Sequence, residues 1–271
     1  MNERRIGGLE RPFICMSNSE YHGDPAISRS FLWELLTTTP LHAKWNRENR
    51  KEPTAAFRIG SATHLAILEP TEFERQIYVS GASRRTKAGK AAHESLTGEG
   101  MIVLTPAEYG LVCGMRDAVA VHPVAKHVFV GGHAESSLFA TDLRTGVRIK
   151  ARYDYVMSNL AFGDLKTTDD ASPSGFARSV FKYGYHVQAA HYMRVAKLNG
   201  LDPKGFVFVA VEKDPPHAVA CYHADEDVIH RGNIALEKAL DLYVYCRDND
   251  TWQGYPDYLM PIETSRHYGR N

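Results

Sequence analysis

The sequence predicts a mixed α/β fold of the α+β kind, with one central mixed sheet flanked by helices. Helical patterns dominate the first half of the chain, a run of short strand patterns follows, and the remainder alternates between helix and hairpin. No linker-like stretch interrupts the chain, so we expect one domain over residues 1–271. Within it we expect a mainly helical part over about 1–130, a sheet-containing core over about 131–250, and a tail over 251–271.

Capping signals and apolar periodicity predict the helices. Thr105-Pro106-Ala107-Glu108 is a capping box with proline at the first helical position, so a helix begins there. Asn199-Gly200 is typical of a helix end and would terminate one long helix. Asp225 caps the last helix. The predicted helices cover 31–36, 40–46, 55–68, 106–120, 173–198 and 226–246.

Alternating or continuous apolar runs predict the strands. Short polar turns at 142–146 and 158–159 join three of them into a meander, so that 147–167 forms a hairpin. The last two strands form a second hairpin. The predicted strands cover 101–104, 135–141, 147–157, 161–167, 206–212 and 217–223.

Composition excludes some classes of protein. Lys and Arg together number 32, as do Asp and Glu, so the formal net charge is zero and nucleic-acid binding would need a local basic patch. The four cysteines form no CxxC pair, which argues against a zinc ribbon or an iron–sulfur site. Residues 1–17 have no apolar stretch like that of a signal peptide, and no run is long enough to span a bilayer. We expect a cytoplasmic protein.

Asp154, Asp164 and Lys166 are the strongest candidates for chemistry. The predicted hairpin brings the two aspartates together, and Asp164 and Lys166 point to the same face of their strand. Two carboxylates at 4 Å repel by roughly 4 kcal/mol at an effective dielectric of about 20, a cost that Mg²⁺ or Mn²⁺ would remove. A lysine beside such a metal suits phosphate chemistry. On spacing alone, a surface ion-pair ladder explains Asp164 and Lys166 at least as well.

Two helices add further candidates. Gln188 and Tyr192 are four residues apart and lie on one face of the helix that follows the Asp-x-Lys strand. His64 lies on a helix face of small residues that includes Gly60. A single histidine in such a place is more often a core or surface residue than a ligand.

Taken together, these motifs resemble a known family. They are Gly60, His64, Leu68-Glu69-Pro70, Arg85-Thr86-Lys87, Gly89-Lys90, Glu135-Ser136-Ser137, Arg152-Tyr153-Asp154, Asp164-Leu165-Lys166-Thr167-Thr168 and Tyr185 to Tyr192. In this order they resemble the C-terminal nuclease domain of exodeoxyribonuclease VIII (RecE), in the PDDEXK superfamily. The resemblance extends from about residue 21 to about residue 252 and implies a PDDEXK, restriction-endonuclease-like core.

This resemblance implies an activity and roles for matching residues. The activity is a Mg²⁺-dependent 5′→3′ exonuclease, with Mn²⁺ able to substitute, that degrades linear double-stranded DNA to 5′-mononucleotides in phage or prophage recombination. The metal ligands would be His64, Asp154, Asp164 and the backbone carbonyl of Leu165. Lys166 would orient and activate the water. Gln188 and Tyr192 match a QxxxY motif that holds DNA or catalytic groups, whereas Glu135 is either catalytic or structural.

The resemblance also implies partners: a homotetrameric ring and a single-strand annealing protein. Four basic residues are candidate DNA contacts, although a solvated surface run explains them too: Arg84, Arg85, Lys87 and Lys90. Two other functions stay open. One is a PDDEXK endonuclease or RecB-like nuclease of another DNA-processing pathway, and the other is a non-catalytic module that binds DNA ends.

Overall fold

A computed structural model describes residues 3–6, 9–49, 54–81, 91, 95–98 and 100–261 of the chain. Its centre is an eight-stranded mixed sheet in the order β1-β2-β6-β7-β8-β9-β10, with β3 beside β7. β8 and β9 are parallel, as are β3 and β7, and the other neighbours are antiparallel. The strands are β1 Glu3–Ile6, β2 Leu9–Ile14, β3 Ile27–Ser28, β6 His133–Thr141, β7 Arg148–Val156, β8 Ala161–Thr168, β9 Gly205–Glu212 and β10 Val219–His223.

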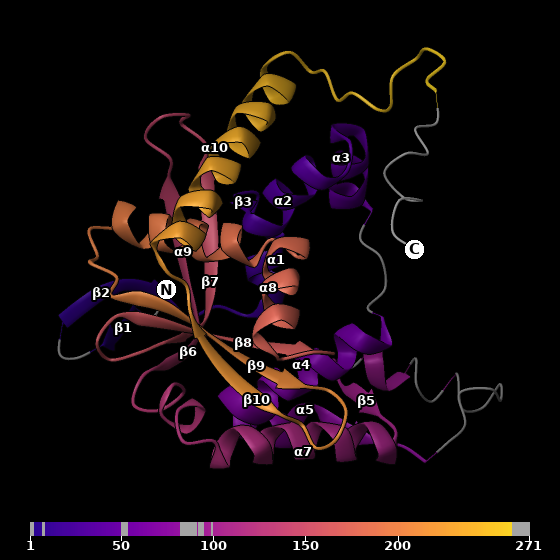
Figure 1. Ribbon diagram of the computed structural model, residues 1–271, viewed down its shortest axis with the longest axis vertical. Coiled ribbons are helices and arrows are strands. Elements are labelled where there is room, and N and C mark those ends of the chain that lie inside the picture. Colours follow the sequence, from indigo (N-terminus) through magenta and orange to yellow (C-terminus); the bar gives the residue numbers. More distant parts are fainter. Residues whose placement is uncertain are drawn as a thin grey trace.

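Helices cover both faces of this sheet. α2, α9 and α10 lie on one side, and α4, α5 and α7 lie on the other (Figure 1). A small parallel sheet of β4 (Ile77–Val79) and β5 (Ile102–Leu104) packs against the second group. The helices are α1 Asn18–Gly23, α2 Arg29–Thr37, α3 Pro40–Glu48, α4 Ala55–Leu68, α5 Pro70–Gln76, α7 Pro106–Val121, η1 Ala125–His127, α8 Pro173–Lys182, α9 Tyr185–Leu198 and α10 Glu226–Asp248.

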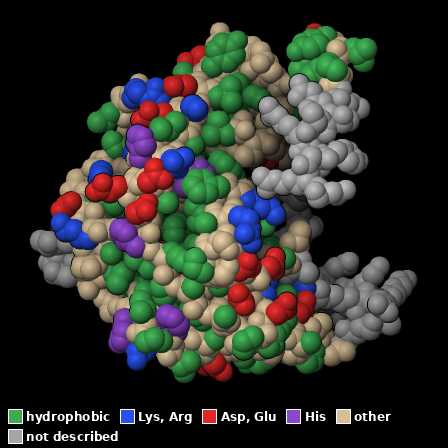
Figure 2. Space-filling model, in the orientation of Figure 1, with side chains coloured by type: hydrophobic (Ala, Val, Ile, Leu, Met, Phe, Trp, Pro, Cys, Tyr) green, Lys and Arg blue, Asp and Glu red, His purple; other side chains and the backbone are tan. Residues whose placement is uncertain are grey.

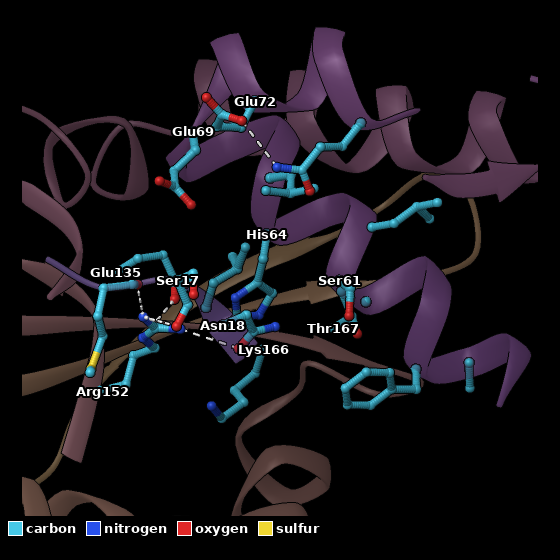
Figure 3. A pocket seen from close by; sticks show the side chains of 18 of the residues that line it. Ser17, Asn18, Ser61, His64, Glu69, Glu72, Glu135, Arg152, Lys166 and Thr167 are labelled. Atoms are coloured by element: carbon cyan, nitrogen blue, oxygen red, sulfur yellow. Dashed lines mark hydrogen bonds and ion pairs between the residues drawn. The ribbon is translucent and has the colours of Figure 1, made fainter. Parts of the chain in front are cut away.

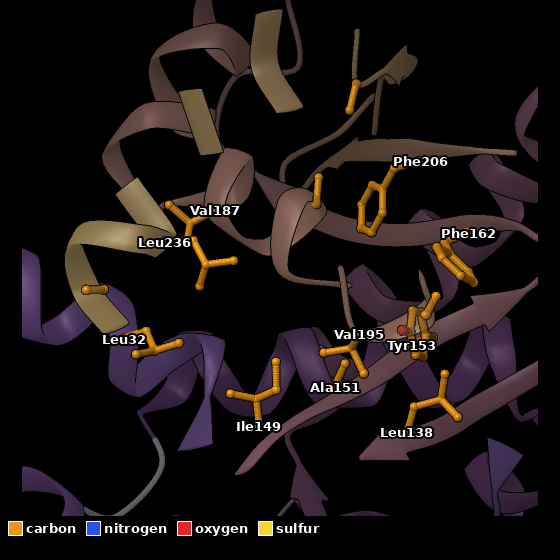
Figure 4. Close-up of a cluster of buried hydrophobic side chains, with 14 of the residues drawn as sticks. Leu32, Leu138, Ile149, Ala151, Tyr153, Phe162, Val187, Val195, Phe206 and Leu236 are labelled. Carbon is orange, nitrogen blue, oxygen red and sulfur yellow. The ribbon is translucent and has the colours of Figure 1, made fainter. Parts of the chain in front are cut away.

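The main core lies between the sheet and the layer formed by α2, α9 and α10 (Figure 4). A second core, on the opposite face, joins β8 and β9 to α7. Phe206 and Phe208 of β9 point into the main core, whereas Val209 and Val211 point into the second. β9 is therefore buried on both faces, which explains its continuous apolar sequence.

Many predicted elements are confirmed, including the mixed central sheet. The capping box at Thr105 starts α7, where Thr105 accepts a hydrogen bond from the N–H of Glu108 at 3.2 Å. Asp225 caps α10 by accepting from the N–H of Val228 at 2.9 Å. The helix predicted over 55–68 has the same bounds as α4. In the described part of the chain, no helix is both long and apolar enough to cross a membrane.

Two predictions differ from the structure. The helix predicted over 173–198 is two helices, α8 and α9, separated at Gly184. Gly184 has a φ of 69°, and a Cβ there would lie 2.5 Å from the Trp33 ring, so glycine allows the chain to turn against the indole. The part over about 1–130 is not only helical, since β1 and β2 belong to the central sheet.

Candidate active site

The candidate active site lies where β7 and β8 separate. Their antiparallel pairing ends at Tyr155 and Gly163, and Asp154 and Asp164 are the next residues across from each other. The backbone N–H of Leu165 donates to Asp154 Oδ2 at 2.9 Å. The predicted hairpin is confirmed, and it brings both aspartates to the end of the paired region.

Glu135 lies on β6, directly opposite Asp154. The residues on either side of Glu135 pair with those on either side of Asp154. Odd-numbered residues of β7 face the main core as far as Tyr153, but beyond Asp154 it is Val156 that does so. The alternation between core-facing and outward-facing residues of β7 therefore shifts by one residue at Asp154. Opposite this step, the backbone of Glu135 is left-handed, with a φ of 48°. Left-handed backbone costs such a residue roughly 1–2 kcal/mol, and strain of this kind is typical of functional sites.

His64, on α4, completes a cluster with these two acids. Its Nδ1 lies 3.5 Å from Asp154 Oδ2. Ligand atoms of His64, Glu135 and Asp154 all lie within 4.8 Å of one another. His64, Glu135 and Lys166 line a cleft of about 700 Å³. Figure 3 shows Glu135 and Arg152 on one side of His64, and Lys166 below it.

The approach of α4 to the sheet depends on small residues. Gly60 and Ser61 lie one turn before His64 and line the same cleft. A Cβ at Gly60 would lie 3.6 Å from Thr167 Oγ1 on β8, so α4 and β8 are in close contact there. The small-residue face of this helix thus leaves the cleft open beside His64.

Asp164 is held from two sides. Gln188 Nε2, on α9, donates to Asp164 Oδ1 at 2.5 Å. Lys166 forms an ion pair with Asp164 Oδ2, and its Nζ lies 4.8 Å from the centre of the Tyr185 ring. Asp164 is 1% exposed. The structure therefore brings Asp164, Lys166 and Gln188 together, beside the cluster of His64, Glu135 and Asp154 rather than within it.

Tyr192, the second residue of the predicted QxxxY pair, lies one turn further from the site than Gln188. The Tyr153 hydroxyl donates to the backbone oxygen of Tyr192 at 2.8 Å. The Tyr192 ring packs against Tyr153, with centroids 5.0 Å apart, and against Phe206 at 6.1 Å. These contacts place Tyr192 in the aromatic part of the main core, under the strand that contains Asp154.

Burial and charge shift the pKa of the acids strongly. Burial, reinforced by the neighbouring Asp154 carboxylate, raises the pKa of Glu135 to about 8, although Arg152 opposes the shift. Burial raises the pKa of Asp164 to about 7, and Asp154 adds to this while Lys166 acts against it. The site thus concentrates negative charge that the protein alone does not balance.

The two basic groups respond in opposite directions. Burial lowers the pKa of His64, although Asp154 opposes this, so the neutral imidazole that a metal requires is favoured. Burial would also lower the pKa of Lys166, but the Asp164 and Asp154 carboxylates outweigh it and the net shift is upward. Lys166 is therefore a cation at neutral pH.

This donor set fits a divalent metal ion. Two carboxylates and a neutral imidazole offer hard oxygen ligands and one nitrogen, which suit Mg²⁺ or Mn²⁺. A cation would also relieve the repulsion that raises the pKa of Glu135. His64, Glu135 and Asp154 are thus a candidate metal site.

Two arginines near the site were not predicted to act there. Arg152 Nε lies 3.6 Å from Glu135 Oε2 and 3.2 Å from Ser137 Oγ. Its position two residues before Asp154 on the same strand was a usable signal. Arg29 donates to Gln188 Oε1 at 2.8 Å, and 159 positions of sequence separate the two, so no local pattern could reveal it.

The predicted DNA contacts Arg84, Arg85, Lys87 and Lys90 lie outside the described residues. On the face shown in Figure 2, acidic and basic side chains are interspersed. This distribution agrees with the zero net charge.

The chain belongs to a described protein family. Residues 30–259 match the family DUF3799, a PDDEXK-like domain of unknown function. The chain is therefore a member of the PDDEXK nuclease superfamily, whose members generally use divalent metal ions. No curated protein matches the chain in sequence.

A solved structure supports the same fold. A protein from Eubacterium rectale, described as a candidate exonuclease, is similar with a TM-score of 0.66 and 14% identity, over 95% of this chain and 100% of that one. A second structure, SSO0001, has a TM-score of 0.30 and 13% identity, over 69% of this chain and 86% of that one. The predicted fold class, a PDDEXK-like core with a helix-flanked mixed sheet, is confirmed.

Proposed function

We propose that this protein is a Mg²⁺-dependent 5′→3′ exonuclease that degrades linear double-stranded DNA to 5′-mononucleotides. The observation that supports a nuclease is the cluster of His64, Glu135 and Asp154 beside a cleft that His64, Glu135 and Lys166 line. The name of the similar Eubacterium rectale structure favours an exonuclease. The polarity and a role in phage or prophage recombination rest on the resemblance to exodeoxyribonuclease VIII, as do a single exonuclease domain, a tetrameric ring and an annealing-protein partner.

Five groups would serve as ligands of the metal. His64 and Asp154 were expected as ligands, their side chains lie 3.5 Å apart, and Glu135 would join them from β6. Asp164 and the Leu165 carbonyl would complete the set, with Asp164 Oδ2 passing from Lys166 to the metal while Gln188 keeps its contact with Oδ1. When bound, Mg²⁺ or Mn²⁺ would polarise the phosphate and lower the pKa of the attacking water.

Lys166 has the position and charge to act on the phosphate. It lines the cleft, and its ammonium group lies between Asp164 and the Tyr185 ring. There it would orient the attacking water and offset the negative charge that develops on the phosphoryl oxygens. Its side chain is 13% exposed and lines the cleft, so a substrate in the cleft could reach this ammonium.

The test is release of nucleotides from linear duplex DNA that bears a label at its 5′ or its 3′ end. The protein is incubated with Mg²⁺ or with EDTA, beside a closed circular control. We expect Mg²⁺-dependent early loss of the 5′ label as mononucleotide, with circles intact. Cleavage of circles would favour an endonuclease, and binding without hydrolysis would favour a DNA-end-binding module.

The Lys166→Ala variant tests the chemistry separately. We expect hydrolysis to fall by about 10²–10³-fold while DNA is still bound, because Lys166 acts chiefly as charge develops. Near-normal turnover by this variant would remove Lys166 from the mechanism.

A further inference from the structure

Arg29 makes two directed contacts, one with α9, which borders the site, and one with the residue that ends α8. It is the first residue of α2. One of its terminal amino groups donates to Gln188 Oε1 at 2.8 Å, and the other donates to the backbone oxygen of Tyr183 at 3.2 Å. The planar guanidinium thus bridges the end of α8 and the side chain of Gln188 on α9.

These contacts fix the orientation of the Gln188 amide. Gln188 is 3% exposed, and its amide has one accepting and one donating end. Arg29 can only donate, so it must face Oε1, and Nε2 then points to Asp164 Oδ1 at 2.5 Å. If the amide turned by half a rotation, two oxygens would face each other at Asp164.

The Asp164 carboxylate is consequently held at both oxygens. Gln188 donates to Oδ1, and Lys166 pairs with Oδ2. Both contacts are buried, since Asp164 is 1% exposed. Arg29 is not among the residues that line the cleft, and its hydrogen bond reaches the site through Gln188, while its charge also acts on Asp164 and opposes the rise in the pKa of that carboxyl.

We propose that Arg29 is a positioning residue that locks the Gln188 amide and thereby holds Asp164 in the orientation that metal binding and hydrolysis require. This inference rests on the proposed function, because it assigns Asp164 to a metal-dependent nuclease site. Groups that orient ligands in this way typically contribute about 10–100-fold to metal affinity or activity.

The experiment compares Arg29→Met and Arg29→Lys with wild type in three measurements. The first is Mn²⁺ affinity by calorimetry without DNA, the second is kcat and KM on linear duplex, and the third is DNA affinity in EDTA. Arg178→Met is the matched control, because Arg178 pairs with Asp170 on the exposed face of α8. Unfolding curves check that each variant folds.

For Arg29→Met we expect Mn²⁺ affinity or kcat to fall by about 10–100-fold, with KM and DNA affinity unchanged. Arg29→Lys keeps the charge but not the planar guanidinium that donates two hydrogen bonds at once, so its loss should be smaller than that of Arg29→Met but still measurable. This variant also tests the proposal if Arg29→Met does not fold. The Arg29→Met/Gln188→Ala double variant should be no worse than Gln188→Ala alone, since both changes remove one interaction.

Three outcomes would overturn the inference. Additive losses in the double variant would mean that Arg29 acts independently of Gln188. Loss of DNA affinity alone would mean that Arg29 contacts DNA. Unchanged Mn²⁺ affinity and kcat in Arg29→Met would mean that it is merely structural. A wild type that binds Mn²⁺ but does not hydrolyse DNA would refute the proposed function, while the calorimetry would still decide the role of Arg29.

Discussion

Glu135 combines a left-handed backbone with a carboxyl group whose pKa is raised to about 8 by burial and by Asp154. Its position opposite Asp154 and near His64 favours the catalytic alternative over a structural one. We expect Glu135→Gln to weaken Mn²⁺ binding by at least about tenfold and to lower kcat similarly, because one charged ligand is lost. Calorimetry and nucleotide release measure this, with Glu237→Gln as a control on exposed α10. If Glu135→Gln binds Mn²⁺ as tightly as the wild type does, Glu135 is not a metal ligand and its role is structural.

His191 is a second buried titratable residue, one turn beyond Gln188 on α9. Its Nε2 contacts the backbone oxygen of Lys150 at 3.0 Å, and Nδ1 has no hydrogen-bond partner in the described structure. Burial lowers the pKa of His191 to about 4, although the Lys150 carbonyl opposes the shift. The folded state therefore disfavours protonation more than the unfolded state does.

The sign of the resulting pH dependence follows directly. The contribution of His191 to stability is complete above its unfolded pKa of about 6.5 and is lost as the pH falls toward about 4. The full effect is on the order of 3 kcal/mol. Urea unfolding in EDTA across this range should show a shallower pH dependence for His191→Gln than for wild type. Parallel curves would contradict the prediction.

At the scale of elements, the break between α8 and α9 sets the direction of the helix that contains Gln188. Gly184→Ala should be more destabilising than Gly200→Ala. Both glycines have a positive φ, but a Cβ at Gly184 meets Trp33 at 2.5 Å whereas one at Gly200 meets nothing within 4 Å. The difference should be about 1–3 kcal/mol, the usual cost of overpacking. Denaturant unfolding of both variants measures it, and equal losses would show that the Trp33 contact is not restrictive.

This break also shows what a sequence pattern can and cannot predict. The starts of α7 at Thr105 and of α10 at Asp225 were predictable because N-capping depends on residues within one turn. The end of α8 was missed although Gly184 is a local signal, because a glycine inside a helical pattern is tolerated in many helices and does not by itself distinguish a break from a continuous helix. The contact with Trp33, about 150 positions earlier, is tertiary and has no local signal. Asp154, Asp164 and Lys166 were found because one hairpin contains them, whereas Arg29 reaches the site only through tertiary packing.

At the scale of the whole molecule, the candidate metal site joins parts of the chain that are distant in sequence. His64 comes from α4 on one face of the sheet, and Glu135 and Asp154 come from two central strands. Asp164 is tied through Gln188 to α9 on the other face. A ligand bound here would contact both halves of the fold at once.

Metal binding should therefore raise the stability of the entire domain. A ligand that binds only the folded state at about 100 times its Kd adds about 2.7 kcal/mol, which corresponds to roughly 5–10 °C in Tm for a chain of this size. Thermal unfolding with Mn²⁺ and with EDTA should show this rise for wild type and not for Asp154→Asn. Asp142→Asn is the matched control: Asp142 is also a buried acid, in the turn between β6 and β7, but it pairs with Arg194 at 3.4 Å, so its metal-induced shift should persist even if its basal Tm falls. An equal shift in Asp154→Asn would place the metal elsewhere in the protein, because Asp154 is one of the three residues whose ligand atoms form the candidate site.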